Sequence, residues 1–383
     1  MRRLIVLGVF SVSALPLAGQ SSQFGVRGLG LPLRPLSVRA AATGGSFGLF
    51  DFASAQNPAS FGVVGRVDAS FQTLQTWTSS ENPLGTSSRR DNRYPGIFIT
   101  GPIGGTRLAL AVSASGFTDR NFALVSRDTI LLRDLPVEVL DTITSLGGMS
   151  DLRFAVAWRR SPAVQIGGGL HLLTGSNRIS SHRVFSDSAY LGATERNTLS
   201  YLGFGVSAGA TVRLIPSLTI AGMARIHNKL RVERDTTRVA SIALPVTLAG
   251  GARLQLGPRL QLAGAAQFRN WSVSDSALRA LGGIGSVNTT EWSAGLEFIP
   301  DPARPFRRTL RLGFHRADLP FLLRPGVDIS ETGVSAGTST QFGGGRIRLD
   351  LALSRIWRRG GPDFSERAFL LNLGIAIAPP GLR

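Results

Sequence analysis

Cysteine is absent from the 383 residues, so the chain can form no disulfide and carries no lipoprotein anchor. Charged residues make up 17% of the chain, against about 25% in typical soluble domains. Beyond residue 20 there is no run of about 18 apolar residues, which excludes transmembrane helices. A chain that is poor in charge and also lacks long apolar runs favours strands that present their two faces to different surroundings.

Lysine occurs only once, at Lys229, although the formal net charge is +18. Nearly all the positive charge is therefore carried by arginine, and the arginines are scattered along the chain. Because nucleic-acid-binding proteins cluster their basic residues, this distribution predicts no nucleic-acid partner. On an exported chain, arginines in loops and at strand ends are expected to meet the anionic head groups of outer-membrane lipids.

The N-terminal residues predict export. Residues 1–20 start with Arg2 and Arg3, continue with an apolar run and end in Ala18-Gly19-Gln20. This layout is typical of a secretory signal peptide, and the apolar run is too short for a transmembrane helix. We therefore expect the mature chain to leave the cytoplasm.

A period of two is the strongest pattern in the rest of the chain. Residues 346–355 read RIRLDLALSR, with an aliphatic side chain at every second position, and the same alternation recurs at residues 107–114 and 152–159. Successive side chains of a strand point to opposite faces, so each of these strands has one apolar and one more polar face. A soluble β-sandwich would alternate in the same way, and the connections decide between the two folds.

The connections favour a barrel. We expect fourteen strands, beginning near residues 62, 93, 105, 150, 162, 198, 217, 241, 258, 289, 307, 329, 345 and 365. Tight turns such as Gly257-Pro258-Arg259 alternate with longer loops, which is typical of bacterial outer-membrane barrels with an even number of strands. The predicted fold is all-β: a monomeric 14-stranded antiparallel transmembrane β-barrel over residues 61–383, in the bacterial outer membrane.

The stretch before the first predicted strand differs from the rest. Residues 21–60 are rich in Ala, Gly and Ser, show no sustained alternation and end close to Asn57-Pro58-Ala59. A barrel of about 8 strands is filled by its own side chains, whereas a wider barrel is either open or plugged. Small residues let a backbone pack closely, so we expect residues 21–60 to form a plug, or hatch, inside the lumen.

A recognisable pattern of small and polar residues lies within this stretch. Its members are Gly44, Gly45, Ser46, Phe47, Asp51, Ala55, Asn57, Pro58 and Ala59. The pattern resembles the N-terminal hatch of the FadL-type outer-membrane transporters of long-chain fatty acids, in which GGAF…D…A…NPA precedes the first barrel strand. The resemblance implies a channel for passive uptake of hydrophobic or amphipathic small molecules such as long-chain fatty acids. An alternative stays open, since similar proteins of the PorV type are scaffolds that bind secreted partner proteins without transporting.

Polar residues on the inward faces of the predicted strands are the candidate contacts for a ligand in the lumen. They are Arg66, Asp68, Arg311, His315, Arg346, Arg348 and Asp350. A fatty-acid carboxylate would pair with an arginine through charge-assisted hydrogen bonds. The alternative role is structural, with internal ion pairs such as Arg348 with Asp350 holding plug to wall.

The loops supply a second candidate region. Residues 117–150 form the longest predicted loop, in which Asp134 and Pro136 are placed to start a helix. A shorter loop helix is expected over residues 274–281, capped by Ser274 or Asp275. In the FadL-type family, helical loops form an apolar landing groove, so the resemblance implies capture of a hydrophobic ligand; packing of the loops on one another is the alternative. The candidate apolar loop residues are Leu131, Leu132, Leu135, Val139, Leu140 and Ile143.

Enzymatic patterns are weak, and we expect neither an enzyme nor a cofactor. Residues 205–209 and 333–337 both read GVSAG and match the G-x-S-x-G of a nucleophile elbow. That elbow requires a sharp turn from strand to helix, and both copies lie within strand patterns. The four histidines lack the spacing of a metal site, and no Ser–His pair on adjacent strands is singled out.

Overall fold

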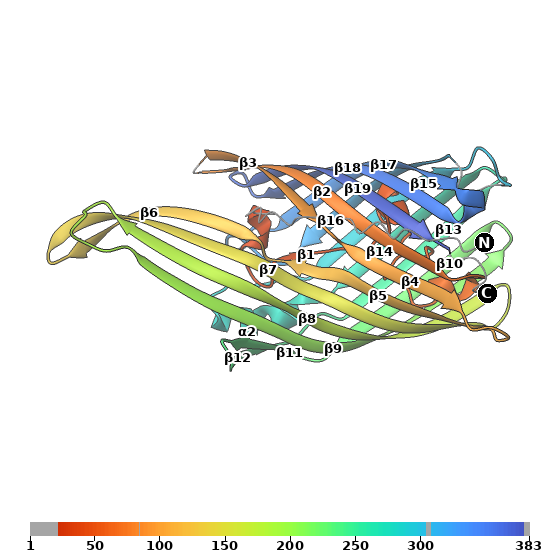
Figure 1. Ribbon diagram of the computed structural model, residues 1–383, viewed down its shortest axis with the longest axis horizontal. Coiled ribbons are helices and arrows are strands. Elements are labelled where there is room, and N and C mark those ends of the chain that lie inside the picture. The colour runs from red at the N-terminus through yellow and green to blue at the C-terminus, as the bar shows by residue number, and fades with distance from the viewer. Residues whose placement is uncertain (1–21, 84, 304–307, 379–383) are drawn as a thin grey trace, which may run out of the picture.

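The chain folds into one antiparallel sheet that closes on itself. A computed structural model describes residues 22–83, 85–303 and 308–378 (Figure 1), and the predicted signal peptide of residues 1–20 lies outside the described part. The last strand, β19 (Ser365–Ile377), pairs with the first wall strand, β2 (Asp68–Asn82), from Ser365↔Glu81 to Ile377↔Ala69. Closure removes the unpaired edges that a lipid bilayer does not tolerate.

The wall has fourteen strand positions, as the sequence predicts. Four positions consist of two consecutive strands each: β3 (Gly85–Arg93) with β4 (Gly96–Pro102), β5 (Leu108–Asp119) with β6 (Phe122–Leu132), β10 (Leu218–His227) with β11 (Leu230–Arg234), and β12 (Thr237–Ile242) with β13 (Thr247–Leu256). The others are β2, β7 (Leu135–Arg159), β8 (Val164–Phe185), β9 (Ala193–Ile215), β14 (Leu260–Arg269), β15 (Thr289–Phe298), β16 (Thr309–Leu319), β17 (Ile329–Phe342), β18 (Ile347–Gly360) and β19.

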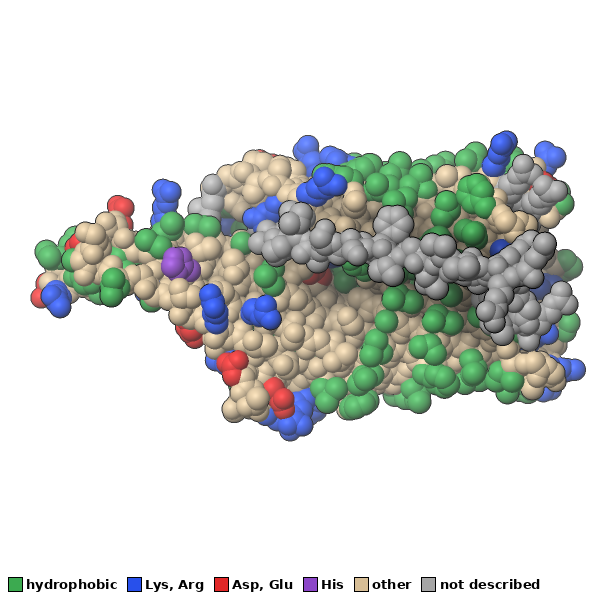
Figure 2. Space-filling view, viewed as in Figure 1, with side chains coloured by type: hydrophobic (Ala, Val, Ile, Leu, Met, Phe, Trp, Pro, Cys, Tyr) green, Lys and Arg blue, Asp and Glu red, His purple; other side chains and the backbone are tan. Residues whose placement is uncertain are grey.

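The period of two separates a lipid-facing surface from the lumen. On β7, Leu152 and Phe154 are exposed on the outside, whereas Arg153 between them is buried. Figure 2 shows hydrophobic side chains over the half of the barrel that carries the short turns, while acidic residues and several basic ones gather toward the other end. This distribution is the one expected of a wall that meets hydrocarbon over part of its height.

The two ends of the barrel differ in the length of their connections. Short turns join β7 to β8, β9 to β10 and β13 to β14, whereas β6, β7 and β8 project far beyond the opposite rim (Figure 1). With 25 residues in β7 and about 3.3 Å per residue, this strand is about 80 Å long, more than a bilayer requires. No helix in the described part of the chain is long and apolar enough to cross a membrane.

The helix expected near Asp134 is wrong. Arg133 and Asp134 have φ angles of 51° and 64° and form the two-residue turn of a β-hairpin in which Leu132 pairs with Leu135. Consecutive left-handed residues match the twist of the two strands, as in type I′ turns. The apolar residues that follow alternate as in a strand, and long-range pairing with β8 stabilises that conformation.

The second expected helix is present. The 3-10 helix η3 (Trp271–Ser274) leads into α2 (Asp275–Ala280), with Ser274 at the N-cap position. The Ser274 hydroxyl donates to the Ala243 carbonyl oxygen, 2.5 Å away, and makes no capping bond to the helix.

Residues 22–67 precede the wall. They contain the 3-10 helix η1 (Gln23–Gly25), the short strand β1 (Leu31–Pro32), the helix α1 (Val38–Ala42) and the 3-10 helix η2 (Ser60–Val63). The wall begins at Asp68, six residues later than the expected start near residue 62, which lies within η2. We refer to residues 22–67 as the N-terminal segment.

The lipid-facing assignment can be tested on β8. Leu170 is 62% exposed on the outside of the wall, and an arginine at this depth should lower the free energy of unfolding by about 2–4 kcal/mol. Leu191 is 91% exposed in the connection from β8 to β9, so Leu191→Arg should change the stability little. Denaturant unfolding in lipid vesicles measures both variants, and equal stabilities would contradict the assignment.

Candidate functional site in the barrel lumen

The N-terminal segment contacts the inside of the wall at both ends of the barrel. Toward the long strands, the Gln23 side chain donates to the Ser365 carbonyl oxygen over 2.8 Å. Toward the short turns, Phe61 is fully buried against Ala109 and Ala157 of β5 and β7. The segment therefore extends along the lumen, and its ribbon lies within the barrel in Figure 1.

The Asn-Pro-Ala triplet attaches this segment to β8 and β9. The Asn57 amide donates to the carbonyl oxygen of Leu49 over 3.0 Å and to the Thr211 hydroxyl over 3.2 Å, and its oxygen accepts from the Ala59 backbone N–H over 2.9 Å. Pro58 lies against Gly167, where a wall side chain would collide with the Pro58 carbonyl. Asn57 and Ala59 are both fully buried.

The other members of the pattern also have identifiable contacts. Gly44 has a φ angle of 67°, and a side chain there would collide with the Phe314 backbone of β16. Asp51 is buried and accepts a hydrogen bond from the Ser37 hydroxyl. Phe47 is fully buried and lies under the guanidinium of Arg39.

A chain of buried charges joins α1 to β15, β16 and β18. Arg39 forms two hydrogen bonds with Glu297, of 2.9 and 2.7 Å, and Arg311 donates to the same carboxylate over 2.7 Å. Arg311 also lies 3.4 Å from Asp350, which pairs with Arg348 over 2.8 Å. Burial lowers the pKa of Arg39, but attraction to Glu297 and Asp51 raises it by more, so its guanidinium stays charged.

A second charged cluster lies farther toward the long strands. Arg34 of the N-terminal segment pairs with Glu291 of β15 over 3.1 Å and lies 3.2 Å from the His315 ring. His315 meets Glu331 of β17 at 3.0 Å, and Glu331 pairs with Arg358 over 2.6 Å. These pairs connect the segment to the same sector of the wall as Arg39.

The structure sorts the candidate lumen residues into two groups. Asp68, Arg311, His315, Arg348 and Asp350 face inward, and the expected ion pair between Arg348 and Asp350 is present. The expectation for Arg66 and Arg346 as strand residues of the lumen is wrong, because both precede their strands and are exposed. Arg66 instead donates to the Gly345 carbonyl oxygen in a short turn, over 2.9 Å.

The candidate apolar loop residues lie on the projecting β6–β7 hairpin. Leu131 and Leu135 are exposed beside its turn, whereas Val139 is buried. Leu132 pairs with Leu135, and Leu140 and Ile143 lie on β7 between β6 and β8. The six residues therefore belong to a sheet extension and do not form one helical apolar face.

A pocket of about 250 Å³, lined by apolar residues together with Arg27, Arg120 and Arg234, lies where α2 meets β9, β11 and β12. We call it the mouth pocket. Five of its lining residues also belong to a buried apolar cluster that includes Trp271 and Phe321. These shared residues are Leu29, Tyr201, Val232, Ile242 and Leu278.

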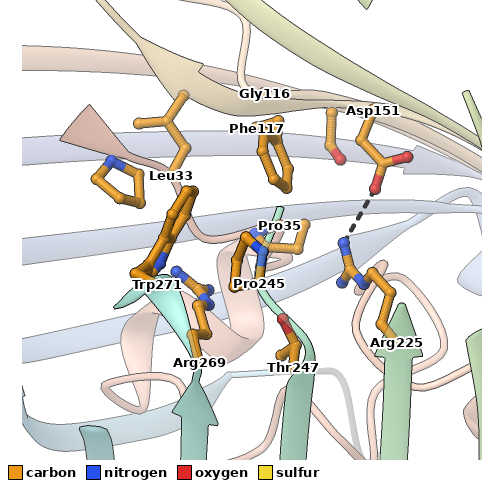
Figure 3. Close-up of a pocket in the computed structure, with 12 residues that line it drawn as sticks. Leu33, Pro35, Gly116, Phe117, Asp151, Arg225, Pro245, Thr247, Arg269 and Trp271 are labelled. Atoms are coloured by element: carbon orange, nitrogen blue, oxygen red, sulfur yellow. Dashed lines mark hydrogen bonds and ion pairs between the residues drawn. The ribbon is translucent and has the colours of Figure 1, made fainter. Parts of the chain in front are cut away.

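On β7 to β10 the lumen carries a polar cluster that sequence reasoning missed. The His171 ring nitrogen Nδ1 lies 2.9 Å from both carboxylate oxygens of Asp151, and Nε2 lies 2.8 Å from the Ser207 hydroxyl. Arg225 donates to Asp151 over 3.1 Å. Figure 3 shows this last pair beside a cavity of about 20 Å³ between the N-terminal segment and the wall. The residues are distant in sequence, and strand register brings them together.

Comparison with solved structures identifies the fold. A FadL homologue from Pseudomonas aeruginosa is similar with a TM-score of 0.61 and 14% identity, over 91% of this chain and 99% of that one. The toluene transporter TbuX of Ralstonia pickettii gives a TM-score of 0.56 and 12% identity, over 90% of this chain and 99% of that one. The toluene transporter TodX of P. putida gives a TM-score of 0.55 and 11% identity, over 91% of this chain and 99% of that one. No protein-family model and no curated protein matches the sequence.

The attachment of α1 to the wall can be tested with a disulfide. A Cβ atom at Gly374 of β19 would lie 3.4 Å from the Cβ atom of Val38, close to the 3.5–4.5 Å usual for a disulfide. The chain has no other cysteine, so Val38→Cys with Gly374→Cys should give one cross-link, seen as faster migration in non-reducing electrophoresis. Leu373 faces outward, and Val38→Cys with Leu373→Cys should remain reduced. Cross-linking of both pairs would contradict the placement of α1.

Proposed function

We propose that this chain, whose barrel has the FadL-type fold, is a monomeric outer-membrane channel for passive uptake of a hydrophobic or amphipathic small molecule, such as a long-chain fatty acid. In this proposal residues 21–60 act as a plug. The observation that carries the proposal is the mouth pocket, because the apolar part of its lining belongs to the buried apolar cluster of the lumen.

Burial of apolar surface is the driving force for capture. Each CH₂ group removed from water contributes about 0.8 kcal/mol, so the apolar side chains of the mouth pocket favour an alkyl or aromatic ligand. The names of the structural neighbours, a FadL homologue and two toluene transporters, agree with cargo of this class. They give no support to the alternative of a secretion scaffold.

In this proposal, passage beyond the mouth pocket involves a conformational change. The cavity beside Asp151 and Arg225 has a volume of about 20 Å³, which holds about one water molecule. The lipid-facing side of β4 to β9 carries a hollow of about 480 Å³, lined largely by apolar residues such as Phe154 and Leu170. Close to it, the pairing of β5 with β7 changes register between Gly116 and Thr118. We propose that displacement of the plug or of this wall region opens the route.

Uptake measurements test the mouth pocket. Leu281 lines the pocket and is half exposed, so Leu281→Glu should fold while placing a carboxylate where cargo binds. We expect the initial rate of uptake of a fluorescent long-chain fatty acid into proteoliposomes to fall about tenfold, equivalent to about 1.4 kcal/mol.

The matched control is Leu131→Glu on the tip of the β6–β7 hairpin, where the residue is 74% exposed. Its uptake should equal that of the unmodified chain. If Leu131→Glu alone reduces uptake, capture takes place on the hairpin. If the unmodified chain shows no uptake above protein-free vesicles, the transport proposal is wrong.

The Val38→Cys and Gly374→Cys pair tests the plug separately. If α1 moves during transport, oxidation should lower uptake at least several-fold, because a disulfide holds α1 against β19, and reduction should restore it. Equal uptake in the oxidised and reduced states would show that cargo passes without displacement of α1.

A further inference from the structure

We propose that Asp151, His171 and Ser207 form a nucleophilic triad in the lumen, able to cleave the carboxylic ester of an apolar molecule. This activity goes beyond transport and does not depend on it. The three side chains lie on adjacent strands β7, β8 and β9, and all face inward. A serine is activated when its hydroxyl forms a hydrogen bond with a base and a third group orients that base.

The hydrogen bonds assign the roles. Asp151 lies 2.9 Å from Nδ1 of His171, so this nitrogen donates its proton to the carboxylate. The other ring nitrogen, Nε2, is then an acceptor and lies 2.8 Å from the Ser207 hydroxyl, which donates to it. Arg225 donates to Asp151 over 3.1 Å and keeps the carboxylate charged. Asp151 thus positions the ring, and His171 is the base.

The wall beside the Ser207 oxygen is built of small residues. A Cβ atom at Gly169, which pairs with Ser207 across β8 and β9, would lie 2.8 Å from that oxygen. Its next neighbour would be Ala155 at 3.4 Å. No larger side chain would fit between Gly169 and the nucleophile, so the Ser207 oxygen has only small wall residues beside it.

A buried guanidinium on the strand next to His171 is the candidate donor for the developing negative charge. Arg153 is the cross-strand partner of His171 and is buried. Its Nε and Nη1 groups have no hydrogen-bond partner within the described residues. Buried and unpaired guanidinium donors stabilise an oxyanion more strongly than donors in water.

The surroundings select an apolar ester. Leu173, two residues from His171 on the same face, is fully buried and belongs to the apolar cluster with Met149 and Trp271. The cavity beside Asp151 and Arg225, of about 20 Å³, is large enough for one water molecule.

The reaction would follow the usual acyl-transfer steps. The Ser207 oxygen forms a bond to the carbonyl carbon while its proton passes to Nε2 of His171. The ester C–O bond then breaks, and the alcohol leaves with that proton. Water next attacks the acyl-serine, again losing a proton to His171, and the carboxylic acid and free Ser207 are released.

A fluorophosphonate probe with an alkyl chain tests the triad on the purified, folded full-length chain. We expect covalent labelling at Ser207, located by mass spectrometry of the modified peptide. His171→Ala should slow labelling by about 100-fold or more, the usual contribution of a general base. Ser207→Ala should abolish both labelling and hydrolysis of a p-nitrophenyl acyl ester. Heat-modified migration in electrophoresis checks that each variant forms the barrel.

The matched control is Ser335→Ala. Ser335 occupies the same place in the second GVSAG sequence, but its hydroxyl donates to the Ala42 carbonyl oxygen. Labelling of this variant should equal that of the unmodified chain.

The positioning role of Asp151 needs its own readout. Asp151→Asn should slow labelling and change the pH at which it is half-maximal, because the ring then lacks its carboxylate. Asp151, Arg153, Arg225 and His227 are the charged or titratable groups that surround the ring. Absence of label at Ser207, or a labelling rate unchanged by His171→Ala, would overturn the proposal and leave the cluster as a structural hydrogen-bond network.

Discussion

The lumen of a fourteen-stranded barrel is wider than its own side chains can fill, and much of the structure follows from that constraint. Closure of the sheet satisfies the backbone in the bilayer but leaves the interior to be occupied by another part of the chain. The N-terminal segment contacts the wall closely because the residues at the points of contact have small side chains or none. Where Gly44 meets β16, and where Gly167 meets Pro58, one added carbon would collide with backbone.

Charge divides the lumen into two sectors. The carboxylates that pair with Arg34 and Arg39 are Glu291, Glu297 and Glu331, all on β15 or β17. Buried ion pairs contribute modestly to stability, because desolvation offsets much of their attraction, but loss of one partner is costly. These pairs therefore specify where the segment lies. On β7 to β10 the buried charges instead face one another and a small cavity. The proposed reaction is therefore placed in this sector.

The barrel could be predicted from the sequence because the patterns that indicate it are local. Alternation and turn length are readable over a few residues, and they indicated the strand number and the two different ends. The prediction of a helix near Asp134 was wrong because the conformation there depends on long-range pairing of β7 with β6 and β8. Alternation correctly predicted that Arg311 and Asp350 face inward. Arg66 and Arg346 lie just before their strands, because strand boundaries depend on tertiary packing. The contact of His171 with Ser207 depends on the register of two strands, which no local pattern reveals.

The two GVSAG sequences show how little a short motif determines by itself. In each copy the first glycine makes room for a histidine of a neighbouring strand, and the last makes room for the N-terminal segment. Packing therefore explains the glycines in both copies, and neither copy forms a catalytic turn. Only the serines differ: Ser335 meets a backbone carbonyl, and Ser207 meets His171. Any chemistry at Ser207 arises from the neighbours that β7 and β8 bring to it, and the motif shared with β17 contributes only the space in which they meet.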